Sequence, residues 1–225
     1  MAGEIDHLLN GTLRGGNRRA VRMGLLGLAG LGIDLKIEGL EHVPSSGPVL
    51  VASNHLHNAD PVLLAMALPR PLYFMAKREL FANRALGGVL RFAGAFPVDR
   101  GKADRQAIRN AETLLAHGEA VAMFPEGTRS VSRKLGAGQP GAGLILIRSK
   151  APLLPVAITG TEWLPGNGSK QTNEKPRGLR RTVRIHFGQM VPNEAFTTSG
   201  AGASQAAADQ IMQEIAQLLP AEYLA

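Results

Sequence analysis

Short apolar runs and amphipathic segments alternate along most of the chain. Residues 33–38 alternate apolar and polar side chains, which predicts a half-exposed strand, whereas residues 49–52 are apolar throughout, as in a buried strand. Further strands are predicted at 72–76, 95–98, 120–124, 154–158 and 182–187, and helices at 61–68, at 79–93 with a break at Gly87-Gly88, and at 103–117, 142–149 and 203–219. This alternation predicts an α/β fold, a single-domain sandwich of flanking helices around a mixed, largely parallel sheet of about seven strands.

Composition narrows the class of protein. With 225 residues, of which 44% are hydrophobic, the chain is long enough for one sizeable core, and we assign residues 33–225 to one domain. The chain contains no Cys, which excludes disulfides, thiolate zinc sites and a cysteine nucleophile and fits a cytoplasmic compartment. The net charge of +7 favours an anionic partner, but nucleic acid is not expected because only 4% of the residues are aromatic and available for base stacking.

The first 32 residues differ from the rest in pattern. Four arginines between positions 14 and 22 have no acidic neighbour, and the eleven apolar or Gly residues at 23–33 are fewer than the ~20 that cross a bilayer. We therefore expect residues 1–32 to be a basic and apolar segment that lies on an anionic membrane surface. This would make the protein peripheral or monotopic at the cytoplasmic face of the cell membrane. The alternative is a helix that packs on its own domain with its arginines in solvent.

A second basic cluster surrounds a loop rich in Gly, Asn and Pro. Its side chains either contact lipid head groups or a charged donor, or are simply solvated. The cluster comprises Lys170, Lys175, Arg177, Arg180, Arg181 and Arg184, with Glu174 as its one acid.

The candidate chemistry begins at His55, where the second apolar run ends. Asp60 follows five residues later, which on one helix would be about 140° away, so the two side chains can cooperate only across a turn. Asp60 is predicted as the N-cap of a helix with Pro61 at its first position, and its carboxylate can then turn back and fix the tautomer of His55. The alternative is that Asp60 is only a cap and His55 only a loop residue. His57 receives no role, and a metal site formed with His55 and Asp60 is not expected.

Other polar residues also follow the ends of predicted strands. Ligands of open α/β sheets bind outside the carboxyl ends of the strands, so these residues are predicted to meet His55 in one site. They are Lys77, Arg100 and the four residues Glu126, Gly127, Thr128 and Arg129.

These residue types suggest acid–base chemistry on a phosphate-bearing substrate. Without a Cys or a Gly-x-Ser-x-Gly elbow, the nucleophile must come from the substrate, with His55 as the base. Arg100 and Arg129 can bind phosphate through two hydrogen bonds each, and Lys77 adds a point charge. Gly127 allows close approach of the backbone to a ligand and Thr128 offers a hydroxyl and an amide. Glu126 holds either an arginine or a substrate hydroxyl, and a purely structural ion pair with Arg129 is the alternative.

Four ordered blocks of the sequence resemble those of the glycerolipid acyltransferases, and most closely the 1-acyl-glycerol-3-phosphate acyltransferases that make phosphatidic acid. The blocks are Asn54-His-Leu-His-Asn-Ala-Asp60, Phe96-Pro-Val-Asp-Arg100, Phe124-Pro-Glu-Gly-Thr-Arg-Ser130 and Leu154-Pro-Val-Ala-Ile158. The resemblance implies the fold of that family, an acyl-CoA or acyl-carrier-protein donor, a lysophosphatidic acid acceptor and no cofactor. It also implies that His55 is the general base, that Asp60 orients it, and that Arg100, Glu126, Gly127 and Arg129 bind the acceptor.

Two other classes of function remain open at this point. The same base could activate water, or could move acyl chains between lipids without CoA, which would make the protein an acyl hydrolase or a transacylase. Alternatively, the basic clusters could serve a non-catalytic module that binds anionic membranes. At 138–143 the sequence is Gly-Gln-Pro-Gly-Ala-Gly, where many members of the family carry a basic residue beside an aromatic one.

Overall fold

The computed structural model describes residues 33–99, 104–164, 181–196 and 199–224. Residues 1–32 and most of the second basic cluster therefore lie outside the described residues. The strands are β1 (Ile33–Glu38), β2 (Val49–Ser53), β3 (Leu72–Lys77), β4 (Ala95–Val98), β5 (Ala120–Met123), β6 (Leu153–Thr159) and β7 (Arg181–Phe187). The α-helices are α3 (Asp60–Ala67), α4 (Arg84–Phe92), α5 (Arg105–Ala116), α6 (Pro140–Ser149) and α7 (Ala203–Ala216), and a short 3₁₀ helix, η2 (Arg78–Phe81), precedes α4.

The strands form one seven-stranded sheet in the order β1-β7-β6-β2-β5-β3-β4. Every neighbouring pair is parallel except β6 and β7, which are antiparallel. The predicted mixed, largely parallel sheet of about seven strands is thus confirmed. Because β2, β5, β3 and β4 are parallel neighbours, their carboxyl ends lie at the same edge of the sheet.

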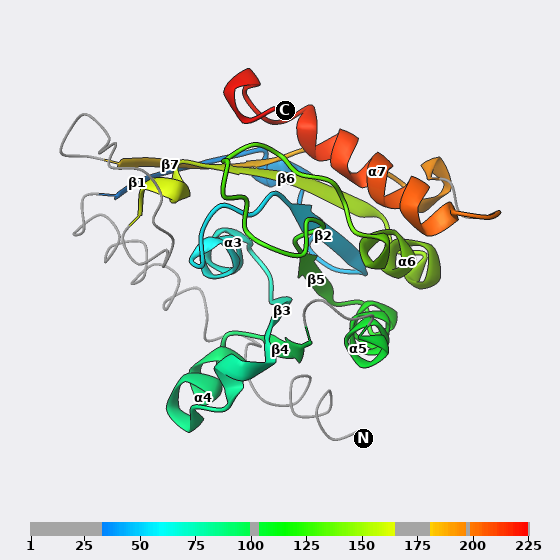
Figure 1. Cartoon of the computed structure of the whole chain (residues 1–225), viewed down its shortest axis with the longest axis horizontal. Coiled ribbons are helices and arrows are strands. Elements are labelled where there is room, and N and C mark those ends of the chain that lie inside the picture. Colours follow the sequence, from blue (N-terminus) through cyan, green and yellow to red (C-terminus); the bar gives the residue numbers. More distant parts are fainter. Residues whose placement is uncertain (1–32, 100–103, 165–180, 197–198, 225) are drawn as a thin grey trace.

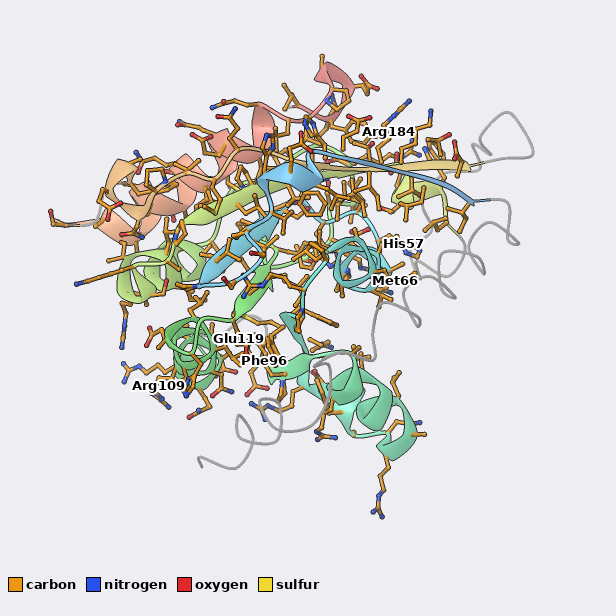
Figure 2. All side chains as sticks on the ribbon, turned by 180° about the vertical axis from the view of Figure 1, so that it is seen from behind. His57, Met66, Phe96, Arg109, Glu119 and Arg184 are labelled. Carbon is orange, nitrogen blue, oxygen red and sulfur yellow. The ribbon has the colours of Figure 1, made fainter. Side chains whose placement is uncertain are left out.

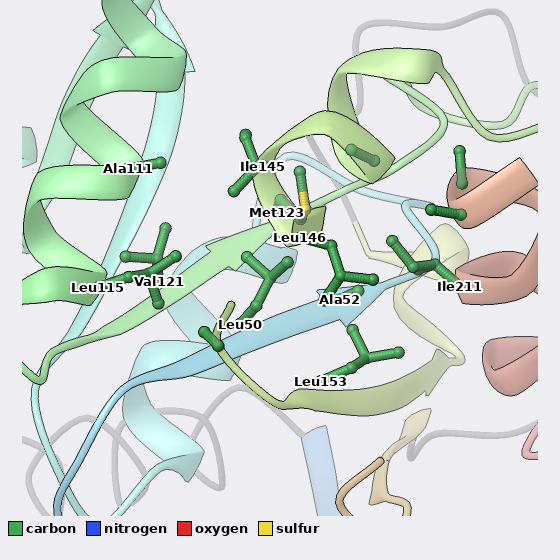
Figure 3. Packing of buried hydrophobic residues seen from close by; sticks show 14 of the residues in the cluster. Leu50, Ala52, Ala111, Leu115, Val121, Met123, Ile145, Leu146, Leu153 and Ile211 are labelled. Carbon is green, nitrogen blue, oxygen red and sulfur yellow. The ribbon is translucent and has the colours of Figure 1, made fainter. Parts of the chain in front are cut away.

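Helices cover both faces of the sheet (Figure 1). Side chains of β2 and β5 alternate between the faces, as the pleat of a strand requires. Leu50 of β2 and Val121 of β5 point to the layer of α5, α6 and α7, where Figure 3 shows them among side chains of all three helices. The neighbouring Val51 and Ala122 point to the opposite face, which includes the buried leucines of α3. The central strands are therefore buried on both sides.

Close contact between α6 and α7 depends on Gly143. A Cβ at this position would collide with the carbonyl oxygen of Ser204 and lie 2.8 Å from the backbone nitrogen of Ala208. The glycine-rich stretch after the Glu126–Arg129 turn thus lets two helices pack backbone to backbone.

Two local predictions are wrong. Helix α4 runs without a break through Gly87-Gly88, because its packing against η2 outweighs the low helix propensity of the two glycines. Asp60 is not an N-cap: it is the first residue of α3, Ala59 occupies the cap position, and the Asp60 side chain turns away from the helix. None of the helices in the described part of the chain has the length and apolar character needed to cross a membrane.

Candidate active site

Asn54 extends the pairing of β2 beyond the end of the strand. Its side-chain Nδ2 donates to the carbonyl oxygen of Ile158 and its Oδ1 accepts from the Ile158 backbone N–H, both at 2.8 Å. The amide side chain thereby replaces a backbone partner for β6. It fixes the chain immediately before His55, and it joins the first sequence block to the fourth.

His55 and Asp60 form the contact that their spacing predicts. The ring Nδ1 of His55 lies 2.8 Å from Oδ2 of Asp60, and the two side chains are 3% and 0% exposed. The same oxygen accepts the backbone N–H groups of Leu56 and His57, each at 2.7 Å. A carboxylate can only accept, so Nδ1 carries the ring proton and Nε2 keeps a lone pair. Asp60 therefore sets both the turn that carries His55 and the tautomer of its ring.

The loop after β5 holds the backbone of His55 from both sides. Oε1 of Glu126 accepts the His55 N–H at 3.0 Å, and the Ser130 N–H donates to the His55 carbonyl oxygen at 2.8 Å. The second oxygen of Glu126 accepts the N–H of Gly136 at 3.1 Å. Burial raises the pKa of Glu126, and the nearby Asp60 adds to the effect, although the two amide hydrogen bonds oppose it. Both carboxylate oxygens thus contact the protein backbone.

A cavity of about 540 Å³ opens beside the His55 ring. The ring stacks on Phe124, with centroids 4.1 Å apart and planes at 21°. The walls of the cavity are mainly apolar and come from the ends of β3, β4 and β5 and from the helices α5, α6 and α7. The lining residues outside the predicted site include Met75, Val98, Ile108, Met123, Pro140 and Leu144, with Asp99, Gln139 and Ser204 as polar members. His55 is thus a polar group at the wall of an apolar chamber.

A model of the family described as Acyltransferase matches residues 34–159, more than half of the chain. The chain belongs to this acyltransferase family. The resemblance of the four sequence blocks is thereby confirmed.

Several curated relatives share 30–40% of their residues with this chain over the matched stretch. The 1-acyl-sn-glycerol-3-phosphate acyltransferase of Bacillus subtilis (strain 168) is 36% identical over 127 residues, which are 56% of this chain and 63% of the relative. The enzyme of that name from Streptococcus pneumoniae is 39% identical over 114 residues, which are 50% of this chain and 42% of the relative. The human alpha form is 31% identical over 147 residues, which are 64% of this chain and 51% of the relative. The chain thus spans about half the length of these relatives.

A solved structure has the same fold. The crystal structure of the 1-acyl-sn-glycerophosphate (LPA) acyltransferase PlsC from Thermotoga maritima matches with a TM-score of 0.68. The match covers 89% of this chain and 78% of the other, at 23% identity.

Among the described residues, only some of the other predicted site residues of this acyltransferase family member line the cavity. Gly127 lines the cavity with a positive φ of 71°, a conformation that favours glycine. Thr128 is exposed and Arg129 half-buried in the same turn. Lys77 is exposed, its Nζ lies 3.2 Å from Glu79 Oε1, and it is not among the described residues that line the cavity. Arg100 lies outside the described residues.

His57 lies in the turn before α3 (Figure 2). Its Nδ1 accepts the N–H of Ala59 at 3.0 Å, and its Nε2 is buried. Burial lowers the pKa of His57, and the charges of Arg129 and His55 add to this against the opposing charge of Asp60. Burial thus disfavours the charged form of the His57 ring. In the described part of the chain, no three His, Asp or Glu side chains are grouped so that they could hold a metal ion.

The second basic cluster is described only at its last position. Arg184 is exposed on β7, on the solvent side of that strand (Figure 2). Lys170, Glu174, Lys175, Arg177 and Arg180 lie outside the described residues, as does the side chain of Arg181. Contact of this cluster with lipid or donor stays a prediction.

Sequence reasoning missed two groups of residues in this site. Asn54 belongs to the first block, but its contact with Ile158 joins positions 104 residues apart and has no local signal. Met75, Ile108 and Leu144 line the cavity, yet their apolar periodicity is the same as that of core residues. A helix or strand position facing a cavity cannot be told from one facing the core by pattern alone.

Proposed function

We propose that this protein transfers a fatty acyl chain from acyl-CoA or acyl-carrier protein to the free hydroxyl of lysophosphatidic acid, producing phosphatidic acid. The observation that carries the proposal is the buried His55–Asp60 pair, whose ring borders a largely apolar cavity. Family membership and the names of the relatives support an O-acyltransferase with this acceptor. Lysophosphatidic acid combines what the site requires: a hydroxyl, a phosphate and an acyl chain.

The mechanism is a direct transfer within a ternary complex. Nε2 of His55 removes the proton of the acceptor hydroxyl as that oxygen attacks the thioester carbon, and Asp60 stabilises the imidazolium that forms. Backbone amides of the 126–129 turn stabilise the charge that develops on the carbonyl oxygen. The C–S bond then breaks, and the leaving thiolate takes the proton from His55. The thioester supplies the driving force, so the reaction needs no metal or cofactor.

The two ends of the substrates would occupy different parts of the site. The acyl chain enters the apolar cavity, where Met75, Ile108 and Leu144 can cover it. The phosphate of the acceptor binds Arg129, with Gly127 allowing close approach and Thr128 donating from its hydroxyl. We assign Arg100 and Lys77 to the outer part of the phosphate site. Arg129→Ala should then raise the KM for lysophosphatidic acid about tenfold or more with little change in the KM for the donor.

A substitution of the base tests the proposal. His55→Ala should lower transfer from labelled acyl-CoA to lysophosphatidic acid by about 10²–10⁴-fold, while thermal unfolding shows a folded protein. His117→Ala is the matched control, since His117 is exposed at the end of α5 and should leave transfer unchanged. If His55→Ala is folded and retains substantial transfer, the assignment fails. Labelled free fatty acid as the main product of the wild type would instead indicate a hydrolase.

The membrane is the source of the acceptor in this proposal. We infer that residues 1–32 contact an anionic bilayer, so that the protein acts at the cytoplasmic face of the cell membrane. In the full chain, Arg18→Glu together with Arg19→Glu should weaken sedimentation with phosphatidylglycerol vesicles. Equal sedimentation of this double variant and the wild type would show that the two arginines do not contribute to membrane binding.

A further inference from the structure

Helix α4 and the 3₁₀ helix η2 form one unit beside β4, the edge strand of the sheet (Figure 1). The helix begins after Asn83, whose Oδ1 accepts the backbone N–H groups of Ala85 and Leu86 at 3.1 Å. At Gly87 it lies so close to η2 that a Cβ would be 3.0 Å from the carbonyl oxygen of Phe81. The two short elements are therefore joined directly.

The solvent side of this unit is apolar and basic. Leu80 of η2 and Leu86 of α4 are 42% and 43% exposed. Each immediately precedes one of the two residues in contact between the elements, Phe81 and Gly87. Residues 77–91 contain four basic residues; the first two pair with the acids Glu79 and Asp99, which leaves two positive charges on α4. The basic residues are Lys77, Arg78, Arg84 and Arg91. Exposed leucines among arginines are typical of surfaces that lie in the interface of an anionic bilayer.

Arg78 connects this unit to the cavity. Its Nε donates to Oδ1 of Asp99 at 2.7 Å, and Asp99 lines the cavity that contains His55. Met75, on the strand that leads into η2, lines the same cavity. Arg78 thus joins η2 to a residue of the cavity wall.

We propose that η2 and α4 dock on an anionic phospholipid bilayer, with Leu80 and Leu86 among the acyl chains and Arg84 at the head groups. The inference deepens the proposed function and rests on it, because the bilayer would supply the lipid acceptor. The docking surface consists of residues other than 1–32. Its occupant is a bilayer because the surface combines exposed leucines with an excess of positive charge.

The absence of Cys from the chain allows a test at single positions. Leu86→Cys in the full chain, labelled with an environment-sensitive fluorophore, is mixed with vesicles of phosphatidylglycerol and phosphatidylcholine. The emission should rise severalfold and shift to shorter wavelength, with a much smaller change on phosphatidylcholine alone. Leu40→Cys is the matched control, since Leu40 is 40% exposed on the connection between β1 and β2 and should give no shift. Arg84→Glu, made in the Leu86→Cys background, should weaken vesicle binding about tenfold.

Three outcomes would overturn the inference. The first is an unchanged emission at Leu86→Cys while the protein sediments with the vesicles. The second is a shift at Leu86→Cys that needs no vesicles and grows with protein concentration, which would make the surface a contact between copies of the chain. The third is an equal shift at Leu40→Cys. The readout requires no turnover, so a His55→Ala variant should give the same shift, and failure of the proposed chemistry would be seen separately.

Discussion

Replacing Glu126 by Gln separates two roles of this carboxylate. The resemblance implies acceptor binding, whereas in the structure its two oxygens accept the backbone N–H groups of His55 and Gly136 at 3.0 and 3.1 Å. Gln has one acceptor oxygen and one NH₂ donor, so one of the two amides would face a donor. An unpaired buried amide costs about 1–3 kcal/mol, and relief of the buried charge offsets part of it. We expect Glu126→Gln to lower the free energy of unfolding by about 2 kcal/mol, or the Tm by roughly 4–8 °C.

The kinetic effect should follow from the displaced backbone of His55. We expect Glu126→Gln to lower kcat with labelled acyl-CoA and lysophosphatidic acid, while the KM for the acceptor changes less than about threefold. Glu194→Gln removes an exposed carboxylate and should change neither the Tm nor kcat. The reasoning is refuted if Glu126→Gln unfolds like the wild type and raises the acceptor KM at constant kcat, because that result assigns the carboxylate to the substrate.

Three further substitutions probe the frame of the site. Gly143→Ala should destabilise the protein by about 3 kcal/mol, because its Cβ would meet the backbone of α7. Gly141→Ala in the same helix has open space at the Cβ and should be neutral or stabilising. Equal Tm values of the two variants would contradict this packing. The lowered pKa of His57 means that the unfolded chain binds a proton more readily below about pH 6.5, so stability falls as the pH drops. His57→Asn keeps an acceptor for the Ala59 amide, and the stability advantage of the wild type over this variant should shrink between about pH 7.5 and 5.5 in denaturant titrations; a constant difference would contradict it. Asp104→Ala removes the side-chain acceptor of the first amides of α5 and should lower stability by about 1–2 kcal/mol, measured in the same way; an unchanged midpoint would show that the cap contributes little.

The sequence was sufficient for the sheet and for the pairing of His55 with Asp60. Buried strands leave continuous apolar runs, and a His followed by an Asp across a predicted turn restricts the geometry to a small set. The N-cap prediction for Asp60 failed because the carboxylate has better partners behind it, in the amides of Leu56 and His57, than in the helix ahead. Local propensity does not include such competition.

Long-range contacts were beyond the sequence. The bond from Glu126 to the His55 backbone joins positions 71 residues apart, and nothing in either block specifies that the carboxylate turns inward. At Gly87 the pattern indicated a helix break, but the small residue serves the approach of η2 instead. The helix break at Gly87 and the N-cap at Asp60 are wrong for the same reason: a glycine or a carboxylate is read as a local signal when its role is set by packing.

The side chain of Asn54 has a consequence for how the site moves. Because it continues the pairing of β2 with β6, and because the His55 amide is bound to a buried carboxylate, the segment that carries His55 is anchored like an interior strand although it has no strand geometry. Its amides should exchange with deuterium only when the sheet itself opens, far more slowly than those of an ordinary surface loop. Displacement of His55 would then coincide with global unfolding, so, if His55 is the base as proposed, the protein would inactivate in one step rather than through a folded but inactive form.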